Sequence, residues 1–185
     1  MDKPIPLNHF VNDILSAFKN SNSKKLRKLH DVVLKETVIH FTKPKLELAV
    51  MAYVLSKIIT KPRFMKKENS QKLQQIEFVL KDLARNIDRF PENQVLRIFN
   101  DLERRLTQLE EGDSRFLTSL MEKGNLKSAA VLYAQGMSLG VAADITGVGK
   151  QDIQNYAGKT QMFDRLIEDS SIHKRMKVAR RLTEV

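Results

Sequence analysis

The feature that most constrains the fold of this chain is the run from Leu46 to Ile59, in which apolar side chains would point in every direction around a helix. A bilayer-spanning helix needs roughly 20 apolar residues, so the run is too short to cross a membrane. A helix without a polar face must instead be surrounded by other elements. We therefore expect a central helix in a bundle. It would begin at Thr42–Pro44, where proline in the first turn is tolerated, and end at Thr60–Pro62.

Two amphipathic segments precede this run. Leu7 to Lys19 has apolar residues at helical spacing, with Asn8 as the expected cap, and the polar cluster Asn20–Ser23 ends it. A second helix is predicted from Ser23 to His40. Thr37–Phe41 is the only short run compatible with a strand, so the chain is predicted to be all-α.

Two further helices follow, separated by Pro91. Their apolar residues recur every 3.5 positions on average, the period of a coiled-coil seam. Because each series covers fewer than three heptads, we expect the two helices to pair within the chain as an antiparallel hairpin. Homodimerisation through this hairpin is a further hypothesis. The first series is Leu73, Ile76, Leu80, Leu83, Ile87 and Phe90, and the second is Val95, Phe99, Leu102, Leu106 and Leu109.

The remaining sequence is predicted to form short helices. Arg115–Lys123 would end at Gly124–Asn125, and Leu126–Gln135 would end at Gly136. Gln161–Asp169 and Ser171–Leu182 would form two C-terminal pieces, the last one basic. Three parts are expected: a basic N-terminal helical bundle (1–67), the helical hairpin (68–111) and a C-terminal domain with a basic tail (112–185).

The stretch from Ser138 to Thr160 has the residue types of two short helices around a tight turn. Ser138 can cap the first helix, and Gly147 can adopt the left-handed conformation that ends it. A second helix would begin at Gly149–Lys150 and stop at Gly158. Ala143, Val148, Ile153 and Tyr156 are the residues expected to face inward.

This spacing of alanine, glycine, valine and isoleucine resembles the helix-turn-helix of DNA-binding regulators. The resemblance covers about twenty residues of the 185 and implies sequence-specific binding of double-stranded DNA. Glutamine and asparagine can bond bidentately to adenine edges. Carried onto this sequence, it assigns Gln151, Gln154 and Asn155 to base reading and Lys150 and Lys159 to phosphate contact.

The sequence departs from the pattern in three ways. Gly149 stands where such motifs usually carry serine or threonine, the second helix has no arginine, and Asp152 would repel phosphate near its start. These departures keep a second class of function open. In that alternative the chain is a non-enzymatic helical adaptor or scaffold whose C-terminal domain binds a protein partner. Binding of RNA by the basic N-terminal helices is a third hypothesis, but an exposed aromatic platform for single strands is missing from the sequence.

Charge is distributed unevenly along the chain, whose formal net charge is +10. Residues 1–67 carry 14 basic and 5 acidic side chains, whereas residues 68–122 carry 8 and 11. If the partner is a polyanion, the N-terminal third should therefore supply many of the phosphate contacts. Solvated lysine-rich faces are the alternative explanation.

Known catalytic and metal-binding patterns are missing from the sequence. There is no cysteine, and no histidine forms an i, i+4 pair with another, so neither a thiol nucleophile nor a metal site is expected. Arg27 and His30 lie one turn apart, a spacing that a helical ribonuclease could use, but a surface pair on a basic helix is the preferred interpretation. No cofactor-binding loop is present. We expect a non-enzymatic cytoplasmic protein with neither a signal peptide nor a membrane span.

Overall fold

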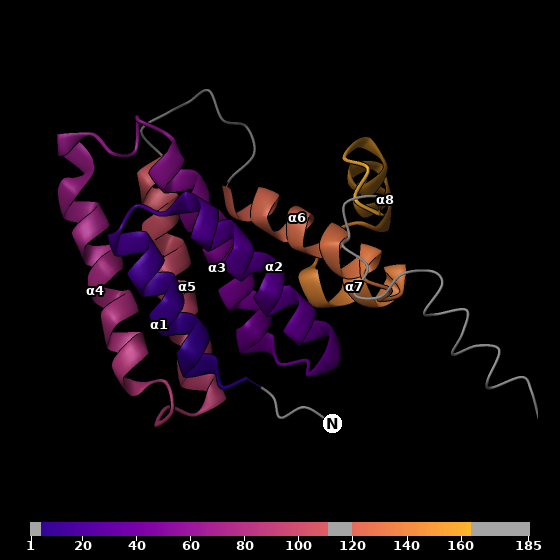
Figure 1. The fold of residues 1–185 in the computed structure, drawn as a ribbon, viewed down its shortest axis with the longest axis horizontal. Helices are drawn as coiled ribbons and strands as arrows, with labels where there is room; N and C mark the ends of the chain where they lie inside the picture. The colour runs from indigo at the N-terminus through magenta and orange to yellow at the C-terminus, as the bar shows by residue number, and fades with distance from the viewer. Residues whose placement is uncertain (1–4, 111–119, 164–185) are drawn as a thin grey trace, which may run out of the picture.

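The computed structural model describes residues 5–110 and 120–163 (Figure 1). These residues are helical and include no strand, which confirms the predicted all-α class, and Thr37 lies inside a helix. None of the helices in the two described ranges combines the length and apolar character needed to span a bilayer. The elements are α1 (Leu7–Lys19), α2 (Ser23–Ile39), α3 (Lys43–Thr60), the 3₁₀ turn η1 (Lys67–Asn69), α4 (Ser70–Asn86), α5 (Glu92–Glu110), α6 (Leu120–Ala134), α7 (Leu139–Thr146) and α8 (Lys150–Lys159).

Helix α3 is the centre of the bundle, as its sequence predicts. Twelve of its 18 residues are buried, and α1, α2, α5 and α6 pack around it. Thr42 caps the helix through its hydroxyl oxygen, which accepts from the Lys45 amide at 3.4 Å. Lys45 itself is buried, and its ammonium lies 3.2 Å from a carboxylate oxygen of Glu36. A buried cation is tolerated because it is paired in this way.

Helices α4 and α5 lie side by side along one flank of the bundle (Figure 1). They run in opposite directions, since the Lys72 ammonium donates to the Gln108 carbonyl at 2.8 Å and the Arg105 guanidinium donates to Gln75 at 3.3 Å. The apolar residues with the 3.5-residue period are mostly buried, with α1 packed on α4 and α3 packed on α5. The seam therefore faces the interior of the bundle.

The predicted break at Gly124–Asn125 is wrong, because α6 runs through it without interruption. Gly124 is buried against α3. A Cβ atom at this position would lie 3.0 Å from Val50 Cγ1 and 3.1 Å from Val54 Cγ2. The glycine thus allows two helices to approach closely instead of ending one of them. The predicted start of this helix, 115–119, lies outside the described residues.

Two helix ends also differ from expectation. Asn8 does not cap α1, which begins after Pro6 without a side-chain cap. The side-chain amide of Asn8 instead donates to a carboxylate oxygen of Asp88 at 2.6 Å. Gly158 does not stop α8, which ends at Lys159. Gln161 lies in a turn with a φ of 48°, so no α-helix begins there. The rest of the predicted C-terminal pieces falls outside the described residues.

Candidate nucleic-acid interface

Helix α7 and the turn that follows it are formed by local sequence signals. The Ser138 hydroxyl oxygen accepts from the Val141 amide at 3.2 Å, which satisfies a donor in the first turn. Gly147 has a φ of 70°, and its amide donates to the Ala143 carbonyl at 2.9 Å. A residue with a Cβ is strained in this left-handed conformation. Both local predictions, the serine cap and the left-handed glycine, are confirmed.

Helix α8 begins at Lys150, after Gly149, which supplies no side-chain cap. The carboxylate of Asp152 lies back over this glycine, so that a Cβ on Gly149 would be 2.9 Å from Asp152 Oδ2. A carboxylate in the first turn of a helix is stabilised by the partial positive charge of the unpaired amides. Two of the departures from the helix-turn-helix pattern therefore lie next to each other. The carboxylate of Asp152, the third residue of α8, lies over Gly149.

One edge of α8 holds it against the rest of the molecule. Ile153 and Ala157 are fully buried, and Val148 and Tyr156 are half-buried. Ala143 on α7 is also buried, so the residues expected to face inward do so. The partners of this edge are α6 and α7.

The solvent-exposed part of α8 carries the side chains that the resemblance assigned to DNA. Lys150, Gln151, Gln154, Asn155 and Lys159 are all exposed, and they project from a single helix. The Gln151 amide donates to Asn155 Oδ1 at 3.1 Å, a pairing of residues one turn apart. Their amide groups are otherwise open to solvent, so the fold does not depend on them.

Helices α7 and α8 lie at the far end of the molecule from α4 (Figure 1). Lys43, in the first turn of α3, reaches this end, where its ammonium donates to the Ile145 carbonyl at 3.1 Å and pairs with Glu47 at 3.0 Å. A cation near the last carbonyls of a helix is stabilising. The contact fastens the carboxyl end of α7 to the amino end of the central helix.

The prediction of a surface pair at Arg27 and His30 is wrong for the histidine. Arg27 is exposed, but His30 is 1% exposed and its Nδ1 lies 3.0 Å from the Ala49 carbonyl. A carbonyl only accepts, so Nδ1 carries the proton of the neutral ring. Burial lowers the pKa of His30, against the opposing effects of this hydrogen bond and of Asp31. The other nitrogen, Nε2, has no hydrogen-bond partner.

Sequence reasoning missed Tyr53, which lies next to His30. The two ring centroids are 5.4 Å apart, and the Lys57 ammonium lies 5.1 Å from the Tyr53 ring centroid. The sequence did offer a signal, because Tyr53 is the only aromatic residue in the apolar run from Leu46 to Ile59 and it carries a polar hydroxyl.

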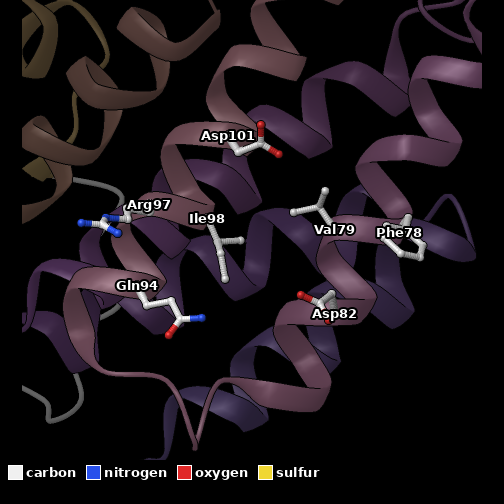
Figure 2. Close-up of a pocket in the computed structure, with 7 residues that line it drawn as sticks. All are labelled: Phe78, Val79, Asp82, Gln94, Arg97, Ile98 and Asp101. Atoms are coloured by element: carbon white, nitrogen blue, oxygen red, sulfur yellow. The ribbon is translucent and has the colours of Figure 1, made fainter.

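A shallow groove of about 250 Å³ lies between α4 and α5 on the outer side of the bundle. Figure 2 shows Val79 and Ile98 facing each other across it, with Asp82 and Asp101 at the sides. Hydrogen bonds from Arg105 and Arg104 lower the pKa of Asp101, so this carboxylate is ionised and paired. Among the residues described, no three metal-ligating side chains gather. The groove is therefore an apolar surface with charged borders.

No protein-family model, curated protein or solved structure matches this chain.

Proposed function

We propose that the chain binds double-stranded DNA sequence-specifically through a helix-turn-helix formed by α7, residues 147–149 and α8, and that it regulates transcription. The observation that carries the proposal is the division of α8 into two faces. Ile153 and Ala157 hold the helix in place, while its glutamine, asparagine and lysine side chains are exposed and are not part of the core. An exposed helix with adjacent amides has the size and the donor and acceptor groups to read base edges in the major groove.

Each side chain has a role set by its chemistry. Gln151, Gln154 and Asn155 would form bidentate hydrogen bonds with adenine, and Lys150 and Lys159 would contact phosphate. The Gln151–Asn155 hydrogen bond would exchange for bonds to a base when the duplex binds. The N-terminal third, with its net charge of +9 over residues 1–67, would add attraction that does not depend on sequence.

We propose further that two copies pair through the outer face of α4 and α5, so that two recognition helices meet successive half-sites. Phe78 is 72% exposed beside the groove, and Val79 and Ile98 line it. Arg97 and Asp82 lie at its border without an ion pair between them. In a two-fold dimer, Arg97 of one copy can therefore pair with Asp82 of the other. Charge does not oppose the contact, because residues 68–110 carry 7 basic and 8 acidic side chains. Equilibrium sedimentation should show a concentration-dependent dimer that Phe78→Ser weakens, and a monomer at all concentrations would contradict this part of the proposal.

The test of DNA binding begins with selection of a preferred duplex from a random pool. Replacing Gln154 and Asn155 by alanine should weaken binding to that duplex by about 1–3 kcal/mol per lost base contact and relax its sequence preference. The matched control is Gln71→Ala with Gln74→Ala, which removes two exposed amides from α4. Unchanged discrimination among duplexes by the α8 variant would remove these residues from base reading.

The adaptor alternative is favoured by one observation, the near-neutral charge around α8. Residues 123–158 carry three basic and two acidic side chains, and Val141 on α7 is an exposed apolar residue. Ionic strength separates the two functions. Affinity for DNA should fall steeply as salt rises, because counterions are released from phosphate, whereas an apolar protein interface should respond far less.

A further inference from the structure

Three helices meet around the side chain of Tyr53, which belongs to α3. His30 of α2 packs on its ring, and the backbone of α6 passes close to it, since a Cβ on Gly124 would lie 3.6 Å from Tyr53 Cδ1. Tyr156 of α8 is near enough to act electrostatically on the Tyr53 hydroxyl. Tyr53 thus lies where α2, α3 and α6 pack together.

Two cations lie beside this tyrosine without a carboxylate partner. Lys57 is one turn along α3 with its ammonium over the ring, and Arg27 projects from the neighbouring helix α2. Neither forms an ion pair or a hydrogen bond with any part of the chain that the structure describes. Burial, and after it the charge of Arg27, lowers the pKa of Lys57. Because the two charges have the same sign and act on each other, an anion bound between them would relieve their repulsion.

The carboxylate one turn further along α2 forms no ion pair with Arg27. Asp31 follows Arg27 by one turn of α2, but its Oδ1 lies 3.9 Å from His30 Nε2 and its side chain is largely exposed. The positive charge of Arg27 and Lys57 is therefore not neutralised on its own surface.

The hydroxyl of Tyr53 adds a neutral donor to the same place. Burial raises the pKa of Tyr53 to about 12, so the O–H keeps its proton at neutral pH. No described residue accepts a hydrogen bond from it. Beside it, the buried Nε2 of His30 is also without a partner. The surface around Tyr53 thus combines two cations and a hydroxyl donor, the groups that proteins use to hold phosphate oxygens.

We propose that Arg27, Lys57 and the Tyr53 hydroxyl form a binding site for a phosphate group. The group comes either from the backbone of a bound duplex or from a small phosphorylated molecule, and only the first source rests on the proposed DNA-binding function.

The experiment compares two probes on the full chain at constant ionic strength. Inorganic pyrophosphate represents the free source and the selected duplex represents the backbone source. Binding of pyrophosphate is followed by amide chemical shifts in NMR spectra, and binding of the duplex by fluorescence anisotropy. The test variant is Arg27→Gln with Lys57→Gln. The control, Arg85→Gln with Arg89→Gln, removes the same charge from exposed positions on the α4 side.

The proposal expects the test variant to lose about tenfold or more in affinity for at least one probe, while the control variant stays near wild type. Loss for pyrophosphate identifies a site for a free phosphorylated molecule, and this result stands even if no duplex is bound. Loss for the duplex alone identifies a backbone contact. Equal losses in the test and control variants, or no loss for either probe, overturn the proposal.

Two simpler variants keep the test valid if the double variant folds poorly. Arg27→Gln changes an exposed residue, and Tyr53→Phe removes one oxygen while it keeps the ring packed on His30. Each should weaken the same probe with an unchanged circular dichroism spectrum. Wild-type affinity in both variants would also overturn the proposal.

Discussion

Helices α3 and α8 are both built from a strong local pattern, but they use their side chains in different ways. In α3 twelve residues are buried, and even its lysine and serine side chains at positions 45 and 56 lie inside the protein. In α8 only Ile153 and Ala157 are buried, and most of the remaining side chains are exposed. The first helix is determined by packing against four other helices, whereas the second is held along one edge.

This difference indicates where a ligand can be accommodated. A substitution at one of the buried positions of α3 must disturb its neighbours on the surrounding helices, so these buried residues serve stability. The outer face of α8 can change without altering the core, so its amides are available for recognition. The four predictions below test this division, beginning with the largest expected effect.

Replacing Leu55 by alanine should lower the free energy of unfolding by about 2–5 kcal/mol, because it leaves a cavity at a fully buried position of α3. Urea denaturation followed by circular dichroism measures the change. The comparison on α8 is Gln154→Ala, whose side chain is exposed. Equal effects of the two substitutions would contradict the central position of α3.

Leucine in place of Gly124 should destabilise the protein by about 1–3 kcal/mol, since its side chain must enter the contact with Val50 and Val54. The same replacement at Gly158 of α8 meets no atom within 4 Å at the Cβ position. There it should be neutral or stabilise by up to about 1 kcal/mol, because leucine favours a helix more than glycine does. Urea midpoints of the two variants should therefore move in opposite directions or differ clearly. Similar midpoints would mean that α6 does not need glycine to approach α3.

Stability should fall as the pH is lowered through the range just below 6.5, because of His30. Its pKa is lowered in the folded protein from 6.5, so the unfolded chain takes up the proton first and acid favours unfolding. The contribution of His30 to the free energy of unfolding is fully present above the pKa that it has in the unfolded chain. As the pH falls from there towards the pKa in the folded protein, this contribution is lost by at most about 1.4 kcal/mol per pH unit. Urea midpoints at pH 7 and pH 5.5 should differ less in His30→Gln than in wild type. His9→Gln, at an exposed position on α1, should keep the wild-type difference.

The smallest change is expected for Gln151→Ala with Asn155→Ala. This pair loses one exposed hydrogen bond between residues one turn apart, so stability should change by about 0.5 kcal/mol or less. A thermal unfolding scan tests it. A large loss would show that these amides support the fold and would weaken the case for their role in DNA binding.

Local chemistry explains what could be predicted from the sequence. The caps at Thr42 and Ser138 and the left-handed Gly147 each depend on a few neighbouring residues, and each is present as expected. The exposed face of α8 follows from the spacing of Ile153 with its apolar neighbours. Such features need no knowledge of what packs against the helix.

The errors concern residues whose role depends on a distant partner. A glycine can end a helix or permit close packing, and only the position of α3 shows that Gly124 does the second. His30 lies four residues after Leu26 and three before Val33, so the buried face of α2 did offer a signal. The basic character of the helix, to which Arg27 contributes, suggested a solvent-exposed position instead. The surface around Tyr53 needs α2, α3 and α6 together, and no local pattern describes that meeting.

The central position of α3 has a consequence for the order in which the chain is made. Two of the helices that cover it, α5 and α6, follow it in the sequence, so they leave the ribosome later. Until residues 120–134 have been synthesised, the nascent protein holds an apolar helix with part of its surface in water, the condition under which chains aggregate. Arrival of α6 completes the cover of α3, and synthesis that halts before it should yield a product that is captured by chaperones or degraded.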